Sequence, residues 1–283
     1  VIPIALAAPN SDERRTEVLS LPVPVAGAIR EEGGRILDTR GRPLRDLRIS
    51  VTDQCNFRCR YCMPKEKFGS RHKFLAHTEL LTFEEILKVA KAFSALGVEK
   101  IRLTGGEPLL RRHIEELVAK LKAIETPTGN PLEVAMTTNA AILARKAQAL
   151  KAAGLDRVTV SLDALTEDLF QAINDVGVPV YEVLKGIHAA CEVGLPVKVN
   201  TVVKRGMNEG EILPLAKTFR GTGITLRFIE YMDAGTANGW RMDDMVPSSE
   251  IVRRINEVWP IAPSEALYRG EVAERWRYLD GAG

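Results

Sequence analysis

The sequence has little of what marks a secreted or a membrane protein. It contains only four cysteines in 283 residues, so it is no disulfide-stapled extracellular scaffold, and we expect a reducing, cytoplasmic location. No apolar run reaches the ~18 residues that a transmembrane helix needs, so we expect no membrane association. The net charge of +2 is too small to indicate nucleic-acid binding by itself, and we expect none.

Three of the four cysteines lie together, and they are the most informative feature that is present. Cys55, Cys59 and Cys62 follow the pattern C-x3-C-x2-C directly after a strand-like run. Cysteine thiolates hold iron–sulfur clusters, normally four for a cubane, so three ligands leave one iron free to bind another molecule. Zinc is the alternative, but structural zinc sites use two spaced ligand pairs, and His72 and His77 form no second pair. A disulfide would need an oxidising compartment.

Strand-like and helical patterns alternate from about residue 45 onward. The alternation predicts parallel β/α units, as an open doubly wound sheet or an incomplete barrel. The strand-like runs are Leu47–Thr52, Val98–Thr104, Leu132–Thr138, Leu155–Leu162, Val197–Val203 and Ile224–Glu230. The helical runs are Phe83–Leu96, Arg111–Ile124, Ile142–Ala153, Val180–Val193, Glu209–Phe219 and Ser248–Val258.

Five of the strand-like runs end in polar residues. Such polar ends can be ordinary turns or helix caps. However, β/α folds place their binding and catalytic sites at the carboxyl ends of the strands. Together they favour one shared cavity at the mouth of a barrel. The ends are Thr104-Gly105-Gly106-Glu107, Thr137-Thr138-Asn139, Ser161-Leu162-Asp163, Asn200-Thr201 and Glu230.

Basic residues stand inside several of these strands. Lys100 and Arg102 are two positions apart and therefore share a face of their strand. A charge inside a barrel strand is costly unless it is paired or functional. Converging cations would suit a polyphosphate, whereas pairing with neighbouring carboxylates would make them structural. The basic residues are Arg48, Lys100, Arg102, Lys198 and Arg227.

The glycine pair after the second strand could also serve a ligand. Gly105 and Gly106 permit close backbone approach, and Glu107 could accept hydrogen bonds from an ammonium group. Pro108 suits the start of a helix, so a plain strand-to-helix turn is the alternative.

Two levels of resemblance follow from these motifs. The cysteine spacing, with the aromatic Tyr61 before the last cysteine, and the run Gly105–Pro108 resemble the signatures of radical S-adenosylmethionine (SAM) enzymes. Longer segments resemble one family among them, the GTP 3′,8-cyclases of molybdenum cofactor biosynthesis, over about residues 41–280. These segments are GRPLRDLRISVTDQCNFRCRYCMPKEKFG, LLTFEEI, IRLTGGEPLLRR, VSLDAL, KVN and RFIEYMD, in the family's order.

The resemblance implies an α/β fold class, an incomplete (β/α)6 barrel of parallel strands with outer helices. It implies that the three cysteines hold a [4Fe-4S] cluster whose open iron binds SAM, the source of a 5′-deoxyadenosyl radical. That radical would abstract the ribose 3′ hydrogen of GTP, and attack on guanine C8 would give (8S)-3′,8-cyclo-7,8-dihydroguanosine 5′-triphosphate. The implied SAM contacts are Tyr61, Gly105, Gly106, Glu107, Ser161 and Met232. The implied GTP contacts are Arg48, Lys100, Arg102, Thr137, Lys198 and Arg227.

The sequence departs from the family pattern in two places. Ala140 stands where the family has glycine, so access to positive φ is lost and we expect a different local turn. Family members also continue past a segment like Val272–Gly283 into a part whose three further cysteines hold a second cluster. We therefore expect one cluster in this chain and impaired GTP turnover. We expect Cys191 to be a buried structural cysteine.

The resemblance also suggests an organisation and partners. The expected parts are a partly disordered extension over 1–40, the partial barrel over 41–260, and the start of a truncated C-terminal region over 261–283. The expected partners are GTP, a second copy of the chain, and a small-molecule electron donor or a flavodoxin-like reductant. The alternative functions are a radical SAM enzyme acting on a peptide or another small molecule, and a non-catalytic subunit of a split system. A zinc-stabilised binding module is a more distant alternative.

Overall fold

A computed structural model of the chain describes residues 30–32, 35–127, 129–232, 239–266, 271 and 273–283. The chain divides into two compact units, Val1–Leu44 and Arg45–Gly283. In the first unit, β1 (Arg30–Glu32) pairs antiparallel with β2 (Arg35–Leu37). Residues 1–29 of the predicted extension lie outside the described residues.

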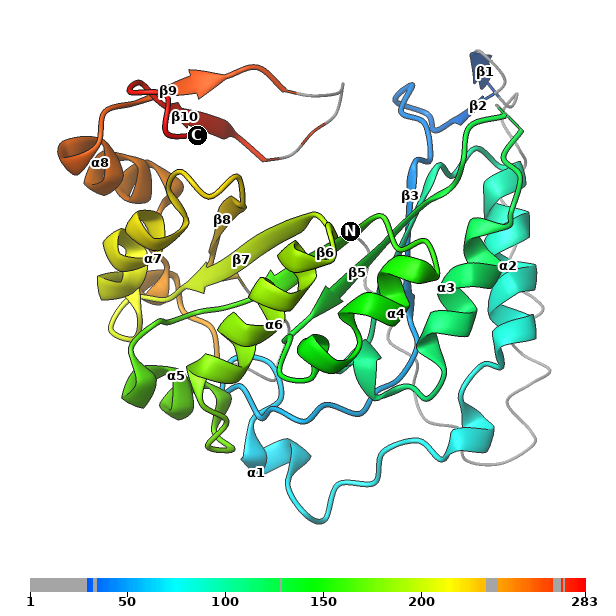
Figure 1. The fold of residues 1–283 in the computed structure, drawn as a ribbon, viewed down its shortest axis with the longest axis horizontal. Coiled ribbons are helices and arrows are strands. Elements are labelled where there is room, and N and C mark those ends of the chain that lie inside the picture. The colour runs from blue at the N-terminus through cyan, green and yellow to red at the C-terminus, as the bar shows by residue number, and fades with distance from the viewer. Residues whose placement is uncertain (1–29, 33–34, 128, 233–238, 267–270, 272) are drawn as a thin grey trace. The chain divides into compact units, whose positions relative to one another are not determined.

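One parallel sheet organises the second unit (Figure 1). Its six strands follow one another in sequence order, whereas a doubly wound sheet would reverse its order at a switch point. The incomplete (β/α)6 barrel predicted from the sequence is thereby confirmed. The strands are β3 (Asp46–Ser50), β4 (Lys100–Thr104), β5 (Glu133–Thr138), β6 (Arg157–Ser161), β7 (Val197–Val203) and β8 (Thr225–Glu230).

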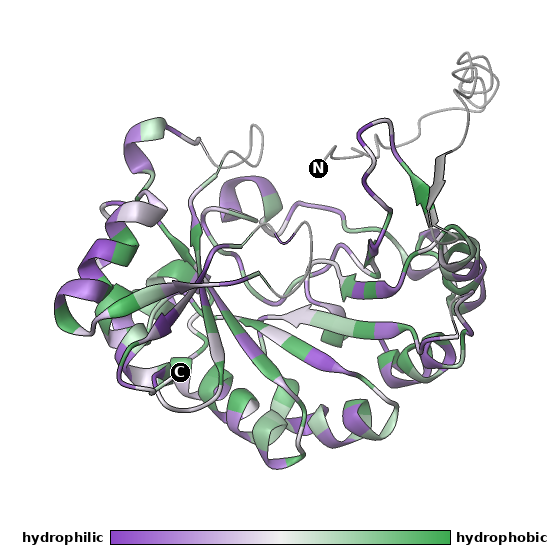
Figure 2. Ribbon diagram, turned by 90° about the horizontal axis from the view of Figure 1, so that it is seen from above, coloured by the Kyte–Doolittle hydropathy of each residue, from purple (hydrophilic) through white to green (hydrophobic). Residues whose placement is uncertain are grey.

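Helices cover the outer side of this curved sheet (Figure 2). The first long one is capped by Thr82. Its hydroxyl accepts from the Glu85 amide at 3.2 Å, and the Glu85 carboxylate accepts from the Thr82 amide at 2.8 Å, which together form a capping box. The helices are α1 (Lys65–Phe68), α2 (Phe83–Ala95), α3 (Ile114–Lys122), α4 (Ala147–Ala152), α5 (Glu167–Asn174), α6 (Val180–Glu192), α7 (Ile212–Phe219) and α8 (Ser248–Val258).

Several short elements differ from the predicted pattern. Two predicted helices begin as 3₁₀ turns, Leu143–Arg145 before α4 and Glu209–Glu211 before α7. Helix α5 and the antiparallel pair β9 (Ile261–Ser264) and β10 (Arg275–Tyr278) were not predicted. Among the described residues, no helix is long and apolar enough to cross a bilayer.

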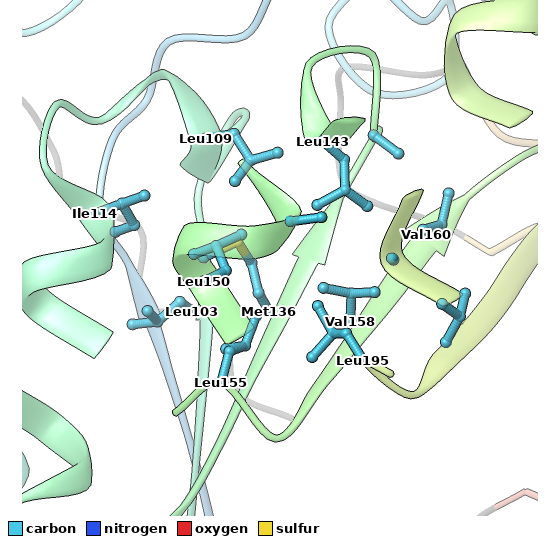
Figure 3. Packing of buried hydrophobic residues seen from close by; sticks show 14 of the residues in the cluster. Leu103, Leu109, Ile114, Met136, Leu143, Leu150, Leu155, Val158, Val160 and Leu195 are labelled. Atoms are coloured by element: carbon cyan, nitrogen blue, oxygen red, sulfur yellow. The ribbon is translucent and has the colours of Figure 1, made fainter. Parts of the chain in front are cut away.

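The hydrophobic core lies between the sheet and the helices. Alternate strand residues such as Leu103, Met136 and Val158 are fully buried there against Leu150 and Leu155 (Figure 3). Their neighbours along each strand point to the opposite side, called the inner face below. The inner face carries the polar and basic strand residues, and the apolar core lies on the other side of the sheet.

Two sequence expectations are wrong. Ala140 takes a φ of 60° although it is not glycine, and it is fully buried. The Thr138 hydroxyl accepts a hydrogen bond from the Ala140 amide at 2.9 Å, which helps to hold this turn. Cys191 is exposed rather than buried. It follows Ala190, the last residue of the buried stripe of α6, and one residue turns a helix by about 100°.

A close contact at Gly186 yields a stability prediction. A Cβ at this position of α6 would lie 2.6 Å from the Ala140 carbonyl oxygen and 3.1 Å from Leu143 Cβ. In an open helix Gly→Ala gains about 1 kcal/mol, but here backbone must move. We therefore expect Gly186→Ala to destabilise the fold by about 1–3 kcal/mol in denaturant unfolding. Gly210→Ala is the control, since within the described residues nothing lies within 4 Å of its Cβ position. Equal stability of the two variants would contradict the packing described.

Candidate active site

The cysteine triplet lies on the loop that connects β3 to α1. Cys55 and Cys59 are partly buried, and Cys62 is exposed. Arg58 organises the loop from within: its guanidinium donates to the carbonyls of Cys55 and Phe57 at 2.7 Å and to that of Phe68 at 2.8 Å. The loop is therefore held in a defined shape by the chain itself.

The three thiols share one electrostatic environment. Burial raises the pKa of each thiol, and neighbouring thiols add to this effect at Cys55 and Cys59. The carboxylate of Glu107 raises the pKa of Cys55 further, and that of Asp163 acts on Cys59 and Cys62 in the same way. Three thiolates beside two carboxylates would be costly unless a cationic group were present. This donor set fits an iron–sulfur cluster, although in the described part of the chain no three His, Cys, Asp or Glu side chains stand ready to hold a metal ion.

The turn Gly105–Pro108 is called the GGEP turn below. Its glycine pair brings it against the segment that precedes Cys55. The Gly106 amide donates to the Thr52 carbonyl and the Glu107 amide to the Gln54 carbonyl, both at 2.7 Å. A Cβ on Gly106 would lie 2.2 Å from the Gln54 oxygen, and one on Gly105, at φ 157°, would lie 2.4 Å from the Thr52 oxygen. Both glycines are therefore needed for this close approach.

The carboxylate of Glu107 ties the GGEP turn to the end of β5. It accepts from the Leu109 amide at 3.0 Å, and from the Thr138 hydroxyl and the Asn139 amide at 2.7 Å. Only 1% of Glu107 is exposed, and burial raises its pKa to about 7 despite these bonds. The Asn139 side chain continues the connection by donating to Asn56 Oδ1 at 2.7 Å. Glu107 thus supports the cysteine loop, a role that the sequence did not reveal.

A second buried carboxylate holds Tyr61. The Tyr61 hydroxyl donates to Asp163 Oδ2 at 2.5 Å, and the Val202 amide donates to Asp163 Oδ1 at 2.9 Å. Burial raises the pKa of Asp163 to about 6. The sequence analysis placed Asp163 in the polar strand end Ser161-Leu162-Asp163 but gave it no role of its own. Ser161 is half-buried at the end of β6, whereas Met232, just beyond β8, is 64% exposed.

Cations gather on the inner face of the sheet. Strand register places Arg48 beside Arg102, Lys198 beside Thr159, and Arg227 beside Asn200. Burial lowers the pKa of Lys198 to about 8, and the charges of Arg157, Arg227, Arg275 and Lys100 contribute to this shift. Burial also lowers the pKa of Arg102, helped by Arg48, Arg157 and Arg227. The predicted cations therefore do converge.

Carboxylates neutralise only one end of this cluster. Lys100 pairs with Asp46 at 3.5 Å and with Glu133 at 3.8 Å, and Arg157 pairs with Glu133 at 2.8 Å. The other cations of the inner face form a second set, called the free cations below: Arg48, Arg102, Lys198 and Arg227. Within the part of the chain that the structure describes, no ion pair joins a carboxylate to any of them.

Polar atoms without partners mark the same face. Thr137 Oγ1, Asn200 Oδ1 and Arg157 Nε are buried and, among the described residues, form no hydrogen bond. Buried polar groups are normally paired, so these atoms indicate a place for a polar ligand. Arg157 and Arg275 were missed in the sequence. Arg157 lies four positions before Ser161 and therefore on the same strand face, a spacing that could have revealed it, whereas Arg275 comes from distant β10.

Comparison with known families identifies the class of protein. The family model described as the radical SAM superfamily matches residues 49–219. The match contains the cysteine triplet, the GGEP turn and strands β4–β7. The chain belongs to the radical SAM superfamily.

Curated relatives narrow the assignment. The GTP 3′,8-cyclase of Acidothermus cellulolyticus is 54% identical over 249 residues, which cover 88% of this chain and 68% of that protein. A GTP 3′,8-cyclase of Staphylococcus aureus is 46% identical over 246 residues, covering 87% of this chain and 71% of that protein. Within the superfamily, the chain belongs to the family of the GTP 3′,8-cyclases.

Solved structures support the fold alone. Streptococcus suis SuiB bound to S-adenosylmethionine superimposes with a TM-score of 0.59 at 18% identity, covering 75% of this chain and 46% of that one. TYW1 with a lysine–pyruvate adduct bound superimposes with a TM-score of 0.52 at 16% identity, covering 78% of this chain and 76% of that one. These likenesses agree with the partial barrel.

The triplet generates a prediction about metal content. Cys191 is the only cysteine outside the triplet, so we expect anaerobic reconstitution of the 283-residue chain to give about four irons per chain. Replacing the three triplet cysteines by alanine should abolish the bound iron and its visible absorbance. Cys191→Ala is the matched control and should retain both. About eight irons per chain, or full iron content in the triplet variant, would refute this assignment.

Proposed function

We propose that this chain is a radical SAM GTP 3′,8-cyclase of molybdenum cofactor biosynthesis, converting GTP to (8S)-3′,8-cyclo-7,8-dihydroguanosine 5′-triphosphate. The observation that carries the proposal is the set of free cations on the inner face, at the strand positions where the resemblance places GTP contacts. The identity of 54% over 88% of the chain supports it. A triphosphate is the part of GTP that such a cluster would bind.

The cofactors follow from the family, and the residues that would hold them are proposals. Cys55, Cys59 and Cys62 would hold the [4Fe-4S] cluster, one per chain. When bound, the cluster and SAM supply the 5′-deoxyadenosyl radical. Around them the chain provides the Tyr61 ring, fixed by Asp163, and the GGEP turn, fixed by Glu107. The proposed SAM contacts are Tyr61, Gly105, Gly106, Glu107, Ser161 and Met232.

The inner face would hold the triphosphate deeper in the barrel than the thiols. Arg48 and Arg102 stand level with each other, two residues before the ends of β3 and β4, whereas the cysteines lie on the loop beyond β3. With its phosphates at this level, GTP would direct its ribose toward the cysteine loop. Thr137 and Asn200 offer unpaired polar atoms beside the phosphates. Lys100, already paired with carboxylates, would contribute a longer-range attraction.

The remaining features of the proposal concern the setting of the reaction. A cytoplasmic location would keep the triplet thiols reduced. The reaction needs a one-electron donor, a small molecule or a flavodoxin-like protein, and a second copy of the chain is a further proposed partner. A peptide substrate has only fold-level support, because SuiB bound to precursor peptide SuiA is 18% identical.

The depressed pKa of Lys198 predicts how GTP affinity depends on pH. Free Lys198 has a pKa of about 8 and loses its proton as the pH rises through that value. Bound phosphate would raise the pKa, so GTP binding above pH 8 must take up a proton and affinity should fall. Lys198→Met should weaken GTP binding about 10–100-fold at pH 7, the value of one charge-assisted hydrogen bond, and flatten the pH profile.

Calorimetry on the anaerobic, SAM-loaded chain at pH 7 and pH 9 would measure both effects. Lys88→Met is the matched control, because Lys88 is exposed on α2. An affinity and a pH profile unchanged by Lys198→Met would count against GTP as the ligand of the inner face.

A further inference from the structure

A strongly basic surface loop follows the cysteine triplet. Residues 60–73, called the basic loop below, contain five Lys or Arg residues and one acidic residue. Its charge of +4 exceeds the +2 of the whole chain, so the rest of the chain is slightly acidic. All five cations are exposed: Arg60, Lys65, Lys67, Arg71 and Lys73.

The basic loop has a fixed shape. The His72 ring packs between Phe68 and Phe74, with ring centroids 4.8 and 4.6 Å away. Lys65 at the start of α1 pairs with Asp175 at the end of α5 at 3.0 Å. Residues 65–67 and 69–73 line an open hollow of about 600 Å³. The cations are therefore displayed on a structured frame rather than on a solvated tail.

This frame is attached directly to the metal-binding loop. Arg58 donates to the Cys55 carbonyl on one side and to the Phe68 carbonyl on the other, and its guanidinium lies 5.3 Å from the Phe74 ring centroid. Cys62, the exposed member of the triplet, lies within the basic loop itself. A partner bound to the basic loop would thus stand next to Cys62 and the loop that carries the triplet.

We propose that the basic loop is the docking surface for an acidic one-electron carrier, a reduced flavoprotein of the flavodoxin class. The inference rests on the proposed function, which requires one electron for each cleavage of SAM. In each encounter the partner's reduced flavin is oxidised by one electron and the iron–sulfur group at the triplet is reduced by one, with no bond formed between the proteins. The rate of electron transfer falls steeply with distance, so a carrier delivers its electron fastest when it docks beside Cys62. Opposite charge speeds such encounters and orients them.

Charge reversal on the basic loop tests the proposal by binding alone. Arg71→Glu/Lys73→Glu should weaken the affinity for purified oxidised flavodoxin about tenfold or more, measured by calorimetry at low salt, and should reduce its salt dependence. The matched control is Lys88→Glu/Lys91→Glu on α2, which changes the net charge equally at two exposed sites elsewhere. Thermal unfolding should show both variants folded. Equal affinities of wild type and both variants would overturn the proposal.

A kinetic comparison separates the docking surface from the chemistry. With reduced flavodoxin as donor, Arg71→Glu/Lys73→Glu should cleave SAM about tenfold more slowly than the wild type, and with dithionite at the same rate. Absence of SAM cleavage with dithionite in the wild type would refute the proposed function instead. A single-stranded oligonucleotide serves as a competing probe. Binding of the oligonucleotide, but not of flavodoxin, through the same cations would overturn the proposal in favour of a nucleic-acid surface.

Discussion

Uncompensated positive charge on the inner face of one parallel sheet is the constraint on which the site depends. The free cations converge there, and burial together with mutual repulsion lowers the pKa of Lys198 and Arg102. Such an arrangement costs folding free energy unless an anion is bound. At the carboxyl ends of the same strands the sign reverses, because three thiols lie beside Glu107 and Asp163. The charge pattern therefore favours a polyanion on the inner face and a cationic cluster at the mouth of the barrel.

The apolar core lies on the opposite side of the sheet from these charges. All the large apolar side chains of β4–β6 face the helices, where Leu103, Met136 and Val160 are fully buried. Phe57 anchors the cysteine loop in the core, and hydrogen bonds between strand ends hold the rest of the site. Glu107 joins the GGEP turn to β5, and Asp163 joins Tyr61 to β7. Each connection orders a loop that carries a proposed cofactor contact.

Much of this could be predicted from the sequence, because strand periodicity and cysteine spacing are local signals. All six strands of the parallel sheet were predicted to within about two residues of their observed ends. What was missed depends on non-local or single-residue detail. The charge of Arg275 acts on Lys198 from a distant hairpin, two of the partners of Glu107 lie 31 and 32 residues away, and α5 is only eight residues long. Ala140 and Cys191 show that one residue type does not fix a turn or a helix face.

The most direct test of the account is the fate of the ribose 3′ hydrogen. GTP deuterated at C3′ would be incubated anaerobically with the reconstituted chain, SAM and dithionite, and the 5′-deoxyadenosine formed would be analysed by mass spectrometry. If the inner face holds the triphosphate and turns the ribose toward the cysteine loop, deuterium appears in 5′-deoxyadenosine. Formation of 5′-deoxyadenosine without deuterium, in the presence of bound GTP, would contradict the account.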